Sequence, residues 1–541
     1  MTGEKQPVYI LPENIQRMMG RDAQRNNILA ARVVADTVKT TLGPKGMDKM
    51  LVSSMGDIII TNDGVTILSE MEIEHPAAKM LVEVAKTQEE AVGDGTTTAV
   101  ILAGKLLENA EKLLDQKIHP TSIVRGYSLA AEKSHEILQK LAKKVSPNND
   151  ALMKSIAMTA MTGKSAEAAK EAFANIMVKA VKQVMEQKEG KFSVDLNNIK
   201  LEKRKGGGVE DTKLIEGLIL DKERVHPDMP LIVKNAKIAL LDIALEIKGP
   251  ETDTKISISS PEQLQAFLNR EEKAIKDMVA KLKNSKATVI FCQKGIDDIA
   301  QYYLAKEKIY ALRRVSKSDM EKLSKATGAR IISNFNEINE KDLGFAQTVE
   351  EIKQGNEGMT YITGCKNPKA LTILIRGGTE HVIDEFERAI KDGLGDIAAT
   401  IQNELVVSGG GAIEIELARL LRKQLILKGR EQLAVEQFAD ALESIPRILA
   451  ENAGMDPIDV ITELKSRHDR NEFDAGLNLF TGKIENTFKA GIIEPLKIKT
   501  QAIKSASEVS TMLLRIDDVI ASGKAPSQQS SQMRSMGDMA Y

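Results

Sequence analysis

The pattern of apolar and polar positions predicts a chain built mostly from amphipathic helices. Over long stretches apolar residues recur every three or four positions, as they do on one face of an α-helix. Between 97 and 116, for example, Val100, Leu106 and Leu113 fall mostly on one side. The helices predicted in this way span residues 12–41, 77–92, 97–116, 119–145, 166–187, 261–283, 381–403, 412–423, 431–453 and 496–521.

Strand-like runs form two groups. Near the N-terminus, Asp57–Ile60 and Val65–Leu68 flank Thr61-Asn62-Asp63-Gly64, whose residues accept left-handed backbone angles and predict a hairpin turn. After about residue 218, runs at 238–241, 287–291, 329–332 and 371–375 alternate with helical segments, which predicts an α/β unit. Ser260-Pro261-Glu262 is a typical helix start. The helix that follows either packs within its own domain or projects as an arm toward another chain.

Composition narrows the class of protein. A chain of 541 residues with 42% hydrophobic and 28% charged residues is expected to form two to four globular domains. The net charge of −2 and the absence of Trp argue against a nucleic-acid partner. No apolar run reaches the roughly 20 residues of a membrane span. Two cysteines without metal-ligand spacing, and no apolar leader, predict a cytoplasmic location. The polar tail 523–541 is predicted to be disordered.

The stretch Gly93-Asp94-Gly95-Thr96-Thr97-Thr98 lies between two predicted helices and is suited to hold an anion. Glycines allow backbone N–H groups to approach a phosphate, and a helix N-terminus has free donors and a positive dipole end. A carboxylate in such a loop would repel phosphate unless a cation lies between them. Asp94 is therefore predicted to bind Mg²⁺. An ordinary helix–turn–helix joint explains the local pattern equally well.

Four further segments carry candidate chemistry, each with a plainer alternative. Gly43-Pro44-Lys45-Gly46 is a turn or a second phosphate cradle, and Asp63 is a turn residue or a carboxylate that binds a metal or orients water. Gly409-Gly410-Gly411 opens a helix and suits contact with a nucleotide. Met158 stands where a P-loop requires its first glycine, which excludes a P-loop there, although Lys164 could still reach a phosphate. Asp392 is a solvated helix carboxylate or faces a cleft.

These motifs occur together in one family. The ordered segments 41–49, 61–66, 93–98 and 409–411, with Arg376-Gly377, Ala475–Asn478 and Glu494–Leu496, closely resemble the group II chaperonins of the archaeal thermosome type, related to the eukaryotic cytosolic chaperonin. The resemblance extends from about residue 10 to 520. It implies a multidomain fold with a mostly α equatorial ATP-binding domain (1–149 and 404–541), a small α/β intermediate domain (150–217 and 371–403) and an α/β apical domain (218–370) with a helical lid protrusion near 245–280.

The resemblance also implies an activity and its residues. Such subunits form two stacked rings of eight or nine copies, from self or paralogous subunits, and enclose non-native proteins when ATP hydrolysis closes the lid. Asp94 would hold Mg²⁺, and Asp63 and Asp392 would position and activate the attacking water. Lys164, beside Gly163, would sense the γ-phosphate. The remaining residues implied to contact ATP are Leu42, Gly43, Pro44, Gly95, Thr96, Thr97, Thr98, Gly410, Gly411, Asn478, Glu494 and Lys499.

Some positions depart from the family pattern. Lys391 precedes Asp392 where His is frequent, Gly393 follows where Ala is frequent, and the tail lacks Gly-Met repeats. Each of Gly393 and Gly395 weakens its helix by roughly 1 kcal/mol. The chain could therefore be a slow or non-hydrolysing specialised subunit of a mixed ring. A metabolic phosphotransferase with similar phosphate loops is the other rival.

Overall fold

The computed structural model describes residues 15–53, 55–163, 169–246, 260–354, 357–366 and 368–522. The chain forms two compact units. The first comprises residues 1–142, 407–492 and 496–541, and the second comprises residues 143–406 and 493–495. Both ends of the chain therefore contribute to the first unit.

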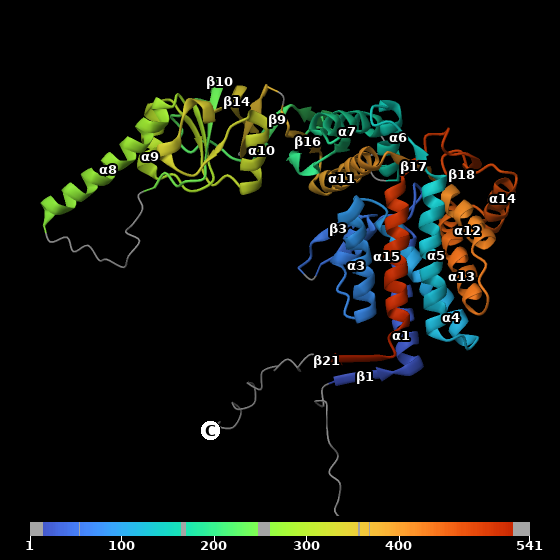
Figure 1. Ribbon diagram of the computed structural model, residues 1–541. Helices are drawn as coiled ribbons and strands as arrows, with labels where there is room; N and C mark the ends of the chain where they lie inside the picture. Colours follow the sequence, from blue (N-terminus) through green and yellow to red (C-terminus); the bar gives the residue numbers. More distant parts are fainter. Residues whose placement is uncertain are drawn as a thin grey trace, which may run out of the picture. The chain divides into compact units, whose positions relative to one another are not determined.

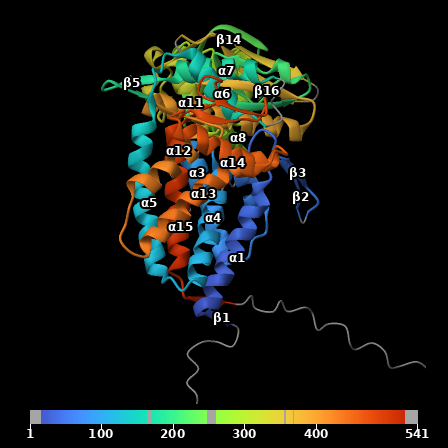
Figure 2. The ribbon, with the colours of Figure 1, turned by 90° about the vertical axis from the view of Figure 1, so that its right-hand side faces the viewer.

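The first unit is a helical bundle built around α4 (Figure 1). Its helices are α1 (Gly20–Lys39), α2 (Gly64–Glu70), α3 (Pro76–Val92), α4 (Thr96–Asp115), α5 (Pro120–Leu141), α12 (Ala412–Gln424), α13 (Glu431–Asn452), α14 (Pro457–Asp469) and α15 (Leu496–Leu514). Figure 2 shows α1, α4, α13 and α15 running lengthwise together. Since α1, α3, α13 and α15 all pack against α4, α4 buries residues around most of its circumference. The sequence had predicted one apolar side.

Three antiparallel strand pairs complete the first unit. They are β1 (Ile15–Met19) with β21 (Asp518–Ser522), β2 (Lys49–Val52) with β3 (Ile58–Thr61), and β18 (Ala475–Asn478) with β19 (Lys483–Asn486). The first pair corrects two predictions, because residues 15–19 were assigned to the start of a helix and 518–521 to the end of another. The tail 523–541 lies outside the described residues.

The predicted hairpin around Asp63 is also wrong. Its first strand exists as β3, but β3 pairs with β2, and the predicted second strand lies in helix α2. Asp63 is the N-cap of α2, and its Oδ2 accepts a hydrogen bond from the backbone N–H of Thr66 at 2.9 Å. Asp is a favoured N-cap as well as a turn residue. Helix formation prevails because it buries Ile67 and Leu68.

The second unit contains a mixed seven-stranded sheet, in the order β12-β11-β10-β14-β15-β9 with β13 also paired to β10. Helix α10 (Lys317–Thr327) covers one face through Leu323, and α8 (Pro261–Asn284) and α9 (Asp298–Lys306) cover the other through Val279 and Leu304. The strands are β9 (Gly217–Leu220), β10 (Ile232–Leu241), β11 (Val289–Cys292), β12 (Tyr310–Leu312), β13 (Ile331–Ile332), β14 (Gly344–Gln354) and β15 (Glu357–Thr363).

A smaller sheet of the second unit has the order β7-β16-β8, with β7 (Ile199–Lys205) parallel and β8 (Lys213–Ile215) antiparallel to β16 (Leu371–Gly377). Helix α11 (Glu380–Asn403) contacts α6 (Asp150–Ala160) and α7 (Lys170–Val184). The remaining short elements are strands β4 (Lys143–Lys144), β5 (Glu186–Lys188), β6 (Lys191–Ser193), β17 (Leu405–Ser408) and β20 (Ile493–Pro495), and 3₁₀ turns at Leu196–Asn198, Val209–Asp211, Phe335–Glu337 and Glu340–Asp342.

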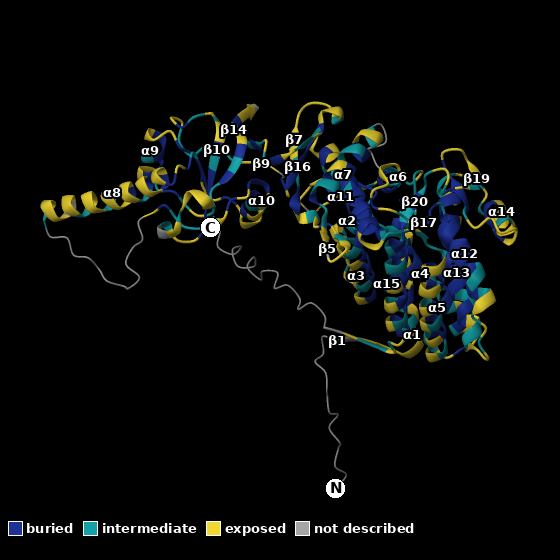
Figure 3. Cartoon of the chain, turned by 45° about the horizontal axis from the view of Figure 1, so that its top comes forward, coloured by how far each residue is buried: buried dark blue, intermediate teal, exposed yellow. Residues whose placement is uncertain are grey.

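Helix α8 begins where the sequence predicted. The Ser260 hydroxyl accepts a hydrogen bond from the Gln263 N–H at 3.3 Å, and Pro261 occupies the first turn. Its second half is anchored by Ile275 and Val279, which are buried. Its first half is mostly exposed (Figure 3), including Leu268. Part of the predicted protrusion, residues 247–259, lies outside the described residues.

Candidate functional site

The Gly93–Thr98 turn joins α3 to α4 through two glycines with left-handed backbones. Gly93 has φ of 94° and Gly95 has φ of 79°. Asp94 lies between them and is half-buried. The Gln88 amide donates to the carbonyls of Asp94 (2.8 Å) and Ile498 (3.3 Å). A Cβ on Gly95 would lie 2.6 Å from Ile498 Cγ2. Since Gly95 has no side chain to cap α4, the first N–H groups of the helix remain suited to an anion.

The start of α2 lies against the start of α4. Thr96 Oγ1 donates to Asp63 Oδ1 at 3.3 Å, while Thr66 donates its N–H and hydroxyl to Asp63 Oδ2. A Cβ on Gly64 would lie 2.6 Å from Thr97 Oγ1. Asp63 thus accepts three hydrogen bonds, and an ionised carboxylate has about four acceptor positions. One position remains for a water molecule, which is compatible with the water-orienting role predicted for it.

Glycines also shape the entry to α12. Gly410 and Gly411 have φ of 68° and 79°. The Leu477 N–H donates to the Gly410 carbonyl at 2.8 Å, and the Thr487 hydroxyl donates to the Gly409 carbonyl at 3.0 Å. A Cβ on Gly411 would lie 2.5 Å from the Cβ of Pro446 in α13. The loop is therefore held between β18 and α13, with the N-terminus of α12 directly after it.

The Leu42-Gly43-Pro44 turn at the end of α1 packs against α13, the helix that also contacts the glycine loop. Asn452 of α13 donates its amide to the Leu42 carbonyl at 2.9 Å. Gly43 has φ of 82°, and a Cβ there would collide with Leu449 of α13. Because Pro446, Leu449 and Asn452 lie within two turns of one helix, α13 holds turns from both ends of the chain.

Two residues implied to contact the nucleotide already have close partners. Asn478, at the end of β18, donates its amide to Glu485 Oε1 at 2.6 Å. Lys499 forms an ion pair with Glu414 at 2.8 Å, and both side chains are buried. Glu414 stands in the first turn of α12 and Lys499 in the first turn of α15. Their pairing joins the start of α12 to the same α15 turn whose Ile498 touches Gly95.

The first unit thus holds two groups of predicted residues. Asp63, Gly95, Thr96 and Thr97 lie at the starts of α2 and α4, and Leu42, Gly43, Gly410 and Gly411 lie in the turns beside α13. Asp392, Gly163 and Glu494 belong to the second unit, and Lys164 lies outside the described residues. Sequence reasoning did not find Gln88, Asn452 or Glu414, whose contacts fix these loops. Gln88 and Asn452 lie inside helices without a motif, but Glu414 follows a glycine-rich helix start at the position of a first-turn acid, which is a usable signal.

Asp392 lies in α11 and is buried, with 6% of its surface exposed. The alternative of a solvated helix carboxylate is therefore wrong. The presence of Gly393, the next residue, is explained by packing. A Cβ on Gly393 would lie 2.8 Å from both Sδ and Cε of Met177 in α7. Gly393 therefore leaves room for the end of the Met177 side chain next to Asp392 in the chain.

Metal and membrane features can be stated for the described part of the chain. There, no group of three or more His, Cys, Asp or Glu side chains could hold a metal ion. Asp94 fits a cation that takes one protein carboxylate and completes its shell with phosphate oxygens and water, as Mg²⁺ does. Of the helices that the structure describes, none has the length and apolar character needed to cross a membrane.

Comparisons with known proteins identify the class. The sequence model of the TCP-1/cpn60 chaperonin family matches residues 34–524. The chain is 59% identical over 522 residues to a thermosome subunit of Methanopyrus kandleri, covering 96% of each, and 57% identical to one of Pyrococcus horikoshii, covering 97% of this chain and 96% of the relative. The open-state monomer of a group II chaperonin from Methanococcoides burtonii matches with a TM-score of 0.58 and 48% identity, covering 79% of this chain and all of that one.

The chain therefore belongs to the TCP-1/cpn60 chaperonin family. This confirms the resemblance predicted from the four ordered motifs. It is an ATP-dependent chaperonin with the chaperonin fold, and its enzymatic activity is the ATP hydrolysis that this family couples to protein folding. The metabolic phosphotransferase is thereby set aside.

Proposed function

We propose that the first unit binds ATP with Mg²⁺ where the N-termini of α2, α4 and α12 lie beside glycine turns. The observation that carries this proposal is the contact of Asp63 with Thr96 and of Gly64 with Thr97, which sets two helix starts side by side. Asp94 is proposed as the Mg²⁺ ligand, and Thr96, Thr97 and Thr98 with Gly95 as phosphate contacts. Bound Mg²⁺ would neutralise charge on the phosphate oxygens. Leu42, Gly43, Pro44, Gly410, Gly411, Asn478 and Lys499 complete the nucleotide site proposed for the first unit. Glu494 is a further proposed nucleotide contact.

In hydrolysis, Asp63 and Asp392 are proposed to position and activate the attacking water, and Lys164 beside Gly163 to respond to the γ-phosphate. A carboxylate that orients water is what phosphoryl transfer needs besides charge neutralisation. The burial of Asp392 supports such a role. Its carboxylate is not a solubilising surface charge, and buried carboxylates are common at functional sites.

The assembly is proposed to consist of two stacked rings of eight or nine subunits that enclose non-native proteins and close a lid on ATP hydrolysis, in the cytoplasm. The proposed domains are equatorial (1–149 and 404–541), intermediate (150–217 and 371–403) and apical (218–370). Archaeoglobus fulgidus has relatives named thermosome subunit alpha and beta, 56% and 58% identical to this chain. Rings of one subunit type and mixed rings are both compatible with these names. Electron microscopy of the purified chain alone would show whether it forms rings without a second subunit type.

Gly410→Ala tests the nucleotide loop. An L-residue in the left-handed conformation costs about 1–2 kcal/mol, and the new Cβ would lie 2.6 Å from the Leu477 carbonyl oxygen. We expect ADP affinity to fall at least about fivefold, measured by calorimetric titration. Gly454→Ala is the matched control, because Gly454 is also left-handed but has open space around its Cα. Equal affinity in both variants would exclude this loop from the site.

Deletion of residues 250–272 tests the proposed lid. The deletion removes the exposed first half of α8 and spares Ile275 and Val279, which anchor the second half. We expect rings and ATP turnover to persist while a bound client protein loses its protection from protease. Negative-stain images and a hydrolysis assay of the same preparation provide the control for assembly. Client protection that survives the deletion would assign the lid elsewhere.

A further inference from the structure

The second turn of α12 carries Glu416, a buried carboxylate that the sequence motifs did not single out. Glu416 is 2% exposed, and its oxygens contact Arg419 at 2.6 Å and His468 Nδ1 at 2.9 Å. His468 lies in α14 and is fully buried. Its other ring nitrogen, Nε2, lies 2.8 Å from the carbonyl oxygen of Ala475, the first residue of β18.

Both partners of the His468 ring are hydrogen-bond acceptors. A carbonyl oxygen can only accept, and an ionised carboxylate likewise has no proton to donate. Burial by itself would raise the pKa of the Glu416 carboxyl, but hydrogen bonds from His468 and Arg419 outweigh it and hold that pKa below its ordinary value. The two ring nitrogens of His468 therefore face one acceptor each, Glu416 in α12 and the Ala475 carbonyl in β18.

These two contacts connect His468 to the two elements that flank the glycine loop, β18 and α12. Through Ala475, His468 holds β18, whose Leu477 N–H donates to the Gly410 carbonyl at 2.8 Å. Through Glu416, it holds the second turn of α12, which starts directly after Gly411. Gly476 of β18 lies so close that a Cβ there would be 2.8 Å from the Gly409 carbonyl oxygen. Residues 409–411 are thus enclosed between two elements that one side chain bonds together.

We propose that His468 is a positioning residue for nucleotide binding, which sets the Gly409–Gly411 backbone by bonding α12 and β18 at once. This inference rests on the proposed nucleotide site, and it extends the site to a helix, α14, that contributes none of the residues assigned above. The loop needs such support because its two left-handed glycines give it backbone freedom that ligand binding would otherwise have to restrict.

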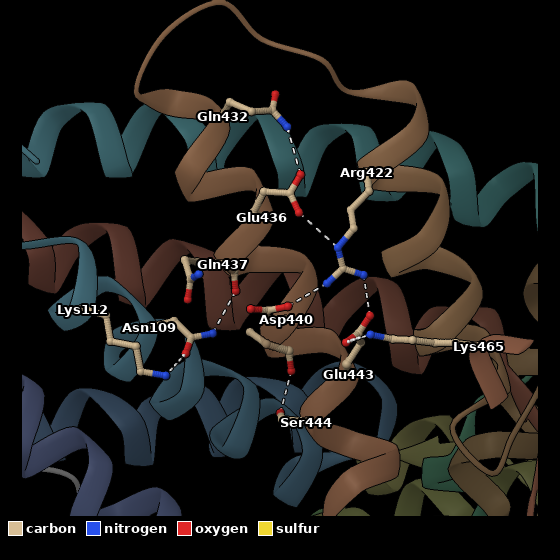
Figure 4. Close-up of polar contacts among 11 residues, drawn as sticks. Asn109, Lys112, Arg422, Gln432, Glu436, Gln437, Asp440, Glu443, Ser444 and Lys465 are labelled. Atoms are coloured by element: carbon tan, nitrogen blue, oxygen red, sulfur yellow. Dashed lines mark hydrogen bonds and ion pairs between the residues drawn. The ribbon is translucent and has the colours of Figure 1, made fainter. Parts of the chain in front are cut away.

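The test replaces His468 by phenylalanine, which keeps a ring but removes both ring nitrogens. We expect the dissociation constant for ADP, measured by titration calorimetry on the full-length assembled protein, to rise about fivefold or more. The matched control is Arg422→Met. Arg422 lies near the other end of α12 and bonds Asp440 (2.7 Å), Glu436 (3.2 Å) and Glu443 of α13 (Figure 4). Its loss should lower the melting temperature similarly and leave ADP affinity within about twofold.

Two further variants keep the outcome decisive. His468→Gln keeps an amide group that can bond one of the two acceptors. It should give a smaller increase of the same kind, and it also covers the case that the phenylalanine variant does not assemble. ADP affinity in both His468 variants that matches the Arg422→Met control would overturn the proposal and leave His468 a purely structural residue. If Gly410→Ala also leaves affinity unchanged, residues 409–411 are not part of the nucleotide site, and the proposed function fails at this loop. If Gly410→Ala weakens binding and the His468 variants do not, the site stands and the positioning role fails.

Discussion

Replacing Asp392 by alanine is expected to reduce ATP turnover by at least about 100-fold, the usual contribution of a side chain that positions or activates the attacking group. Nucleotide affinity should stay within about twofold of the wild type, because the carboxylate is proposed to act on water rather than on the nucleotide. Single-turnover hydrolysis and calorimetric titration of the same preparation measure the two quantities separately.

Asp396→Asn is the control for this variant. Asp396 lies one turn further along α11 and is also buried, so its substitution tests whether disturbing any buried carboxylate of that helix stops turnover. We expect hydrolysis to persist in Asp396→Asn. Equal turnover in Asp392→Ala and the wild type would remove Asp392 from the mechanism.

Asp94→Ala is expected to abolish the dependence of ATP binding on Mg²⁺. In the wild type, adding the ion should strengthen binding, since the Asp94 carboxylate and the phosphates share it. Without that carboxylate, affinity in Mg²⁺ should fall at least about tenfold, which corresponds to 1.4 kcal/mol. Titrations of both proteins with Mg²⁺ and with EDTA measure the effect.

The wild type in EDTA should bind ATP no more tightly than Asp94→Ala does in Mg²⁺, because its Asp94 carboxylate then faces the phosphates without a cation between them. Asp115→Ala is the matched control, because Asp115 lies at the opposite end of α4 and pairs with Arg25 on the surface. It should respond to Mg²⁺ as the wild type does. An Asp94→Ala protein that still gains affinity from Mg²⁺ would place the ion on another ligand.

Helices with strong periodicity and glycine turns were predictable because their signals are local. The break at Gly93–Gly95 and the start of α12 after Gly411 follow from backbone freedom that the sequence displays directly. The pairing of β1 with β21 was not predictable in this way. Arg17 and Asp518 bond across 501 positions, and only the folded bundle brings their segments together.

The same distinction between local signals and long-range contacts applies to the candidate site. Its glycine loops were found from their residue pattern, but the residues that pack against them were not. Gln88 and Asn452 bond carbonyl groups 410 positions away, and His468 contacts Glu416, 52 positions away. Asp63 shows an intermediate case. The sequence singled it out as a candidate, and it contacts Thr96 at the start of α4. Its element was misassigned, since the same Asn-Asp-Gly chemistry serves hairpins and helix starts.

The split of the first unit between both ends of the chain has a consequence for synthesis on the ribosome. Residues 143–406 are nearly all of the second unit and emerge as one uninterrupted piece, so this unit can fold while translation continues. Helix α4 cannot complete its packing until much later. It packs against α13 and α15, which are among the last helices to be translated. Until then its apolar surface needs shielding, so the nascent chain of this chaperonin is itself a candidate client for other chaperones.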